Sequence, residues 1–86
     1  MSDKELKPIP PARAADELRK LSAANKAGEY SASEYEHRFA RTIQELRDRQ
    51  IAGTRAEIMA ALEPLRLDGS VTPSEWVRFT TQLGLV

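Results

Sequence analysis

The chain has 86 residues, contains no cysteine, and balances thirteen lysines and arginines against thirteen aspartates and glutamates. A chain of this length forms one small domain, which without disulfides relies on helix packing or self-association for stability. The even charge balance removes the basic footprint that nucleic-acid binding usually leaves. Because no apolar run is long enough for a signal peptide or a membrane span, we expect a cytoplasmic protein without a membrane partner.

The first predicted elements are a tail and a helix. Residues 1 to about 10 are polar and rich in proline, so they are expected to form a flexible tail that is extended or disordered. Pro11 suits the first turn of a helix, and Leu18 and Leu21 begin an apolar stripe. Gly28 ends this helix where a left-handed cap is needed.

A second helix is predicted from Ser31, which begins a capping box with Glu34 three residues later. Its apolar face is the longest in the chain and consists of Tyr35, Phe39, Ile43 and Leu46. The helix is expected to run to about Ile51, with Gly53 as its stop.

The third and fourth helices follow a very short connection. Thr54 and Glu57 form a second capping box, and Pro64 predicts a kink or an early end of the third helix. Thr72 and Glu75 form the third box, and Gly84 stops the fourth helix.

The segment Gly28–Tyr35 returns in similar form as Gly69–Trp76, so one helix-turn-helix unit is used twice. We therefore predict an all-α fold: two hairpins, about residues 11–50 and 54–86, packed as one small bundle after the tail at 1–10. The single β contact expected joins Tyr30 and Val71. The predicted core is Leu18, Leu21, Tyr35, Phe39, Ile43, Leu46, Ile58, Leu62, Leu65, Trp76, Phe79 and Leu83.

The second turn, Asp68–Glu75, resembles the later half of an EF-hand calcium loop. Asp68 falls on the fifth loop position and Glu75 on the twelfth, which the resemblance implies as calcium ligands. The first and third positions hold Pro64 and Arg66, which cannot supply carboxylates. The first repeat, Leu18–Tyr35, is also similar to bacterial SHOCT-type helical hairpins, which implies use as a scaffold or contact module.

Side chains that could carry chemistry are few. His37 is the one histidine and has neither a nucleophile nor a second metal ligand beside it in the sequence. We therefore expect no enzymatic activity, no cofactor and no metal.

The predicted function is a non-enzymatic helical protein–protein interaction module: an adaptor, regulator or inhibitor that is a candidate homodimer. The residues predicted to contact the partner are apolar ones that a small core need not absorb, namely Met59, Leu67, Val77, Leu85 and Val86. One alternative is a helix-turn-helix regulator that binds nucleic acid through Arg38, Arg41 and Arg78; the other is a divalent-cation sensor that uses Asp68 and Glu75.

Overall fold

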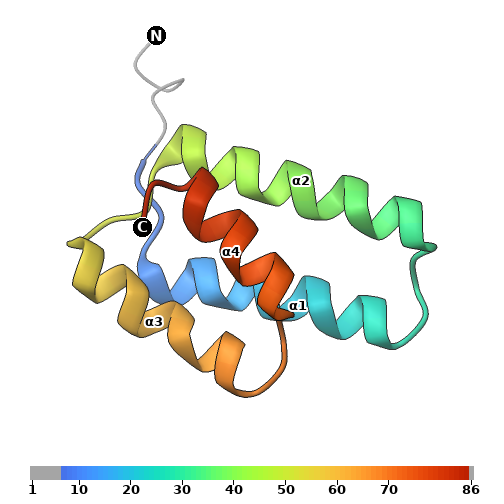
Figure 1. Ribbon diagram of the computed structural model, residues 1–86. Coiled ribbons are helices and arrows are strands. Elements are labelled where there is room, and N and C mark those ends of the chain that lie inside the picture. Colours follow the sequence, from blue (N-terminus) through green and yellow to red (C-terminus); the bar gives the residue numbers. More distant parts are fainter. Residues whose placement is uncertain (1–6, 86) are drawn as a thin grey trace, which may run out of the picture.

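The computed structural model of the protein describes residues 7–85, in which four α-helices and no strand are found. The helices are α1 (Pro11–Lys26), α2 (Ala32–Arg49), α3 (Arg55–Leu67) and α4 (Pro73–Gln82) (Figure 1). The predicted all-α bundle of four short helices is confirmed. Within residues 7–85, no helix is both long and apolar enough to cross a membrane.

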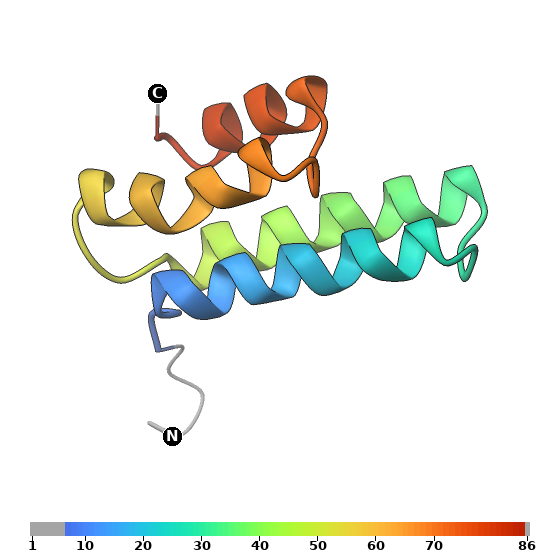
Figure 2. The same cartoon turned by 90° about the horizontal axis from the view of Figure 1, so that it is seen from below.

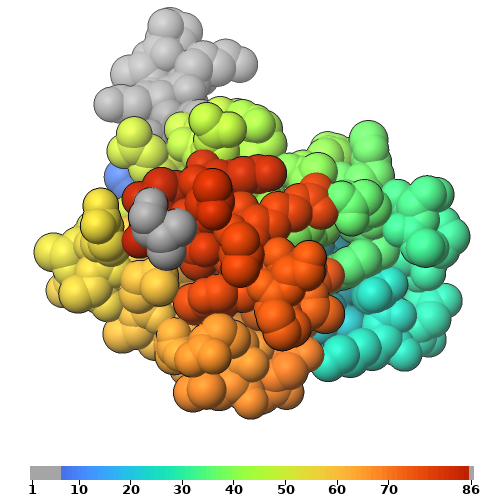
Figure 3. Space-filling view, in the orientation of Figure 1, coloured from blue at the N-terminus to red at the C-terminus, as the bar shows by residue number. Residues whose placement is uncertain are grey.

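The helices form two layers. Helices α1 and α2 lie side by side and antiparallel, and α3 and α4 cover one face of this pair (Figure 2). Helix α1 packs most extensively against α3, and α2 also contacts α4. The side chains of α4 occupy the front of the molecule between those of α2 and α3 (Figure 3). The main contacts therefore run between the hairpins as well as within them.

The core lies between the two layers. Most of the predicted core residues are buried: Leu18, Phe39, Ile43, Leu46, Ile58, Leu62, Leu65 and Phe79. The others, Leu21, Tyr35, Trp76 and Leu83, are only partly buried and pack against the edge of this cluster. Four buried apolar residues lie outside the predicted set: Ile9, Ala14, Val71 and Leu85. All four except Ala14 belong to segments between or beyond the helices, where helical periodicity gives no signal.

The helix caps follow the sequence closely. Both bonds of the predicted capping boxes are present at Thr54 in α3 and at Thr72 in α4. Ser31 accepts a hydrogen bond from the Glu34 amide (3.2 Å), but the Glu34 carboxylate pairs with Arg38 on the next turn. At the start of α2, the hydrogen bond from the Glu34 amide to the Ser31 hydroxyl is therefore present, and the Glu34 carboxylate is used for an ion pair instead of for the capping box.

The ends of α2 and α3 differ from the predicted ones; at Pro64 the early end is wrong, and the alternative, a kink, stays a prediction. Helix α2 ends at Arg49, because Gln50 adopts a left-handed backbone (φ 67°, ψ 150°) three residues before the expected stop at Gly53. Helix α3 continues past Pro64 to Leu67, and the Pro64 carbonyl accepts the Asp68 amide at 2.9 Å. Pro64 has no amide to donate to the Ala60 carbonyl and its ring crowds that carbonyl, but the amides after it still donate, as that of Asp68 does.

At its inner end the predicted tail is extended and buried at Ile9, and not flexible or disordered. Ile9 is only 3% exposed, and it forms an isolated parallel β-bridge with Ile51. The Ile9 amide donates to the Gln50 carbonyl and the Ala52 amide donates to the Ile9 carbonyl, both at 2.8 Å. This bridge forms in place of the expected pairing between Tyr30 and Val71, whose turns lie apart in Figures 1 and 2.

Candidate functional site

An open groove of about 700 Å³ runs between α1 and α2 and contains no residue of α3 or α4. We call it the outer groove. Its walls are two helical stripes, each with the spacing i, i+3, i+4, i+7, that places side chains on one face. The stripe on α1 is Glu17, Lys20, Leu21 and Ala24; the stripe on α2 is Arg38, Arg41, Thr42 and Glu45; Tyr30 from the turn completes the lining.

The charges of the outer groove are only partly neutralised within the chain. Arg38 lies 3.5 Å from Glu34, and its guanidinium stacks 4.6 Å from the centre of the Tyr30 ring. Among residues 7–85, Lys20 and Arg41 form no ion pair. The groove thus presents cations that are available to a binding partner.

The predicted nucleic-acid residues are only partly brought together. Arg38 and Arg41 both line the outer groove, whereas Arg78 lies on α4. There it forms an ion pair with Glu36 and stacks 5.0 Å from the centre of the Phe39 ring. Arg78 therefore joins α4 to α2 and is not part of a basic stripe with the other two arginines.

The predicted apolar partner residues have different positions. Leu67 and Val77 are exposed, by 70% and 62%, as expected of a contact surface. Met59 packs against the core and is half-buried. Leu85 is buried because the glycine cap of α4 turns it back onto the helix, where its amide donates to the Thr80 carbonyl (2.8 Å), so its assignment to a free surface is wrong. Val86 lies outside the described residues.

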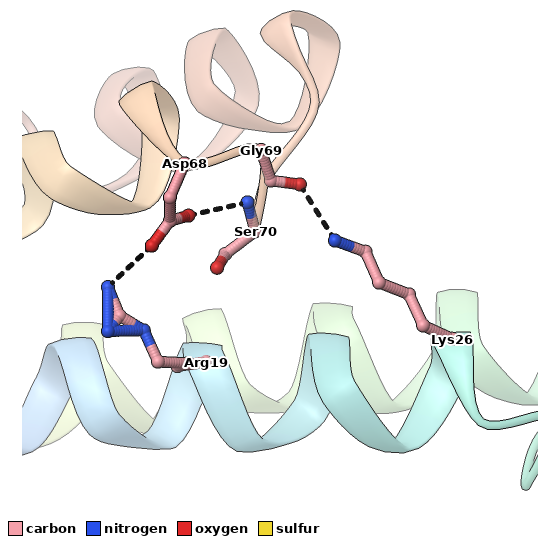
Figure 4. A network of polar contacts seen from close by, with 5 residues as sticks. All are labelled: Arg19, Lys26, Asp68, Gly69 and Ser70. Atoms are coloured by element: carbon pink, nitrogen blue, oxygen red, sulfur yellow. Dashed lines mark hydrogen bonds and ion pairs between the residues drawn. The ribbon is translucent and has the colours of Figure 1, made fainter.

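The turn between α3 and α4, which resembles a calcium loop, is held by side chains of α1 (Figure 4). One Asp68 oxygen accepts the Ser70 amide (2.8 Å), and the other pairs with Arg19 (3.0 Å). Lys26 Nζ donates to the Gly69 carbonyl at 3.1 Å. The hydrogen bonds from Ser70, and then the Arg19 charge, hold the pKa of Asp68 below its usual value. Two protein cations thus contact this turn.

Glu75, the last residue of that loop pattern, is also engaged. One carboxylate oxygen accepts the Thr72 amide (2.9 Å), and the other accepts the Tyr35 hydroxyl (2.8 Å). Burial of Tyr35, and then its hydrogen bond to Glu75, raise the pKa of the phenol above its usual value. Glu75 therefore connects α4 to α2, and both predicted calcium ligands already serve structural contacts.

Within residues 7–85, no group of three or more His, Cys, Asp or Glu side chains is gathered closely enough to hold a metal ion. No protein-family model, curated protein or solved structure matched the chain. The candidate site is therefore defined by the geometry of the groove alone.

Sequence reasoning identified Arg38 and Arg41 but missed the α1 wall of the groove. Glu17, Lys20 and Ala24 were available as a signal, since their spacing places them on one face of the first helix. What the sequence could not supply was the side of α1 on which α2 packs, because that depends on the contacts of both helices with α3 and α4.

Proposed function

We propose that this protein is a small, non-enzymatic helical module that binds another protein as an adaptor, regulator or inhibitor in the cytoplasm. The observation that carries the proposal is the outer groove, an open furrow between two antiparallel helices that no part of residues 7–85 fills. Helical partners commonly bind by laying a side-chain stripe into such a groove.

The composition of the groove supports recognition by a protein side-chain stripe. Leu21, Ala24 and Tyr30 offer an apolar surface, and charged residues border it on both helices. A surface that combines apolar contact with charged residues beside it is typical of protein interfaces. Because Glu17 and Glu45 also line the groove, a nucleic-acid phosphate chain would meet carboxylates along its path.

The test is affinity capture from a native lysate with the wild-type protein and two tryptophan variants. Ala24→Trp fills the outer groove, whereas Ala23→Trp adds the same ring on an exposed position of the same helix outside the groove lining. We expect a stoichiometric partner protein that Ala23→Trp retains and Ala24→Trp loses. Recovery of nucleic acid alone, or equal capture by both variants, would contradict the proposal.

Self-association is the second part of the proposal, and it rests on Leu67 and Val77, which expose large apolar side chains. Exposed apolar residues of this size contribute to dimer contacts when they gather in one patch. Sedimentation of the wild-type protein beside a Leu67→Asp/Val77→Asp variant tests it: a homodimer is expected to become a monomer in the variant, and a monomeric wild-type protein would exclude it.

A further inference from the structure

Like charges lie opposite each other along the outer groove. Since α1 and α2 run antiparallel, the end of the α1 stripe that carries Glu17 meets the end of the α2 stripe that carries Glu45. Lys20, three residues after Glu17 on α1, and Arg41, four residues before Glu45 on α2, share the next level. Two helices that satisfied each other across this seam would place opposite charges there.

The same pattern extends by one more level. A smaller hollow of about 100 Å³ continues the groove toward the start of α1, and Arg13 and Arg49 line it together with Glu17 and Glu45. From the start of α1 onward, the groove therefore has three successive charged levels. They are basic (Arg13 and Arg49), acidic (Glu17 and Glu45) and basic again (Lys20 and Arg41). Arg49 is partly satisfied, because it lies 3.8 Å from Glu45 and donates to the Lys7 carbonyl at 3.1 Å.

We propose that the outer groove receives an α-helix of a partner protein whose facing stripe carries acidic, basic and acidic residues at successive levels. This inference rests on the proposed function and names the partner of the same site. The levels on α1 are separated by three or four residues, which is also the spacing of neighbouring residues on one face of a partner helix. Because the charge pattern is the same in both directions, the partner helix can run parallel or antiparallel to α1. Carboxylates of the partner lie against Lys20 and Arg41, and a lysine or arginine lies between Glu17 and Glu45.

Apolar residues line the end of the groove that lies toward the turn between α1 and α2, beyond the charged levels. Leu21, Ala24 and Tyr30 line that part of the groove, and the Arg38 guanidinium lies over the tyrosine ring. A leucine or methionine of the partner helix, placed one turn beyond its carboxylates, fits this small apolar surface. The charges therefore set the register of the partner helix, and the apolar residue adds buried area.

The test uses a displayed library of helical peptides whose facing positions are drawn from Glu, Lys and Leu. It is selected separately on the wild-type protein and on the variant Lys20→Glu/Arg41→Glu. The control variant, Arg47→Glu/Arg55→Glu, makes the same change in net charge at exposed positions outside the outer groove. All three proteins are first compared by circular dichroism, because the substituted side chains are exposed and the fold is expected to persist.

Peptides enriched on the wild-type protein are expected to carry Glu and Lys in the order stated above. They should bind Lys20→Glu/Arg41→Glu about tenfold more weakly, since two attractions become repulsions, and bind the control within about twofold. Peptides enriched on Lys20→Glu/Arg41→Glu should carry Lys in place of Glu only at the level that faces these two substituted positions. Amide shifts of the wild-type protein should map the binding to α1 and α2.

Several outcomes would overturn the inference. Enriched peptides that bind the groove variant and the wild-type protein equally, or no enrichment on the wild-type protein, exclude the proposed helix. Peptides whose binding is lost only with Leu67→Asp/Val77→Asp would overturn the groove as the site while the interaction-module function survives. Tight binding of a short single-stranded RNA, lost in Lys20→Glu/Arg41→Glu, would assign the groove to nucleic acid and contradict both proposals.

Discussion

Replacement of Gln50 by glycine is expected to stabilise the protein. Gln50 occupies a backbone region (φ 67°, ψ 150°) that is almost exclusive to glycine, and such strain costs a residue with a Cβ about 1–3 kcal/mol. Its amide donates to Leu46 and its carbonyl accepts from Ile9, so both of these bonds involve only the backbone and survive the substitution. The strain is therefore removed without loss of either contact.

The stability gained by relieving the strain at position 50 is partly offset by an effect of glycine on the unfolded chain. Glycine makes the unfolded chain more flexible, which costs about 0.4–1 kcal/mol of stability. The net increase in the free energy of unfolding is about 1 kcal/mol, which raises Tm by about 4–8 °C in a domain of this size. Urea and thermal unfolding followed by circular dichroism measure both quantities.

Two controls separate strain from other effects. Gln50→Ala removes the side chain but keeps the Cβ, so its stability is expected to stay within about 0.5 kcal/mol of the wild-type value. Gln44→Gly places glycine inside α2 at an exposed position and is expected to destabilise by about 1 kcal/mol. If Gln50→Gly is neutral or destabilising while Gln44→Gly behaves as expected, the strain argument is refuted.

Three further predictions concern the tail, the tyrosine contact and the calcium-like turn. Ile9→Ala should lower the free energy of unfolding by about 2–4 kcal/mol because Ile9 is buried. The control Leu67→Ala, at an exposed position, should change it by less than about 0.5 kcal/mol. Equal effects of the two variants in urea unfolding would contradict the packing of Ile9 into the core. Tyr35→Phe should cost about 1 kcal/mol below pH 10, since it removes the hydroxyl that donates to Glu75. Because folding raises the pKa of Tyr35, the stability that its hydroxyl contributes is complete below the pKa of the unfolded state, about 10, and is lost as the pH rises further. The wild-type protein should therefore lose its stability advantage over Tyr35→Phe at higher pH. A difference in unfolding free energy that stays constant with pH would argue against the contact. Millimolar calcium should leave the amide spectrum around Asp68 unchanged, because its oxygens already accept or pair within the protein, and saturable shifts there would revive the cation sensor.

The helices and their starts were predictable because the signals are local. Thr54 and Thr72 begin helices with both bonds of a capping box, and each of these bonds spans three residues. The buried faces of α2 and α3 follow from helical spacing, which requires no knowledge of the partner helix. All of this information is contained within a few turns of sequence.

The features that were missed depend on residues far apart in the chain. Ile9 looks like part of a polar tail until Gln50 and Ala52 are brought beside it. Gln50 is an unexceptional residue for a helix end, and its left-handed backbone is fixed by these contacts instead of by its own preference. The outer groove has the same origin, because Lys20 and Arg41 become neighbours only when α1 and α2 pack.

The bridge at Ile9 also determines how much of the chain can fold alone. The two hairpins are similar in sequence, yet the first takes a backbone donor from Ala52, beyond its own end, and packs its α1 against α3 of the second. A fragment that stops at Gln50 would expose Ala14 and Leu18 and leave the Ile9 carbonyl without that donor. The cooperative unit is therefore the pair of hairpins together with residues 7–10, and one hairpin transplanted into another protein would bring only half of its core.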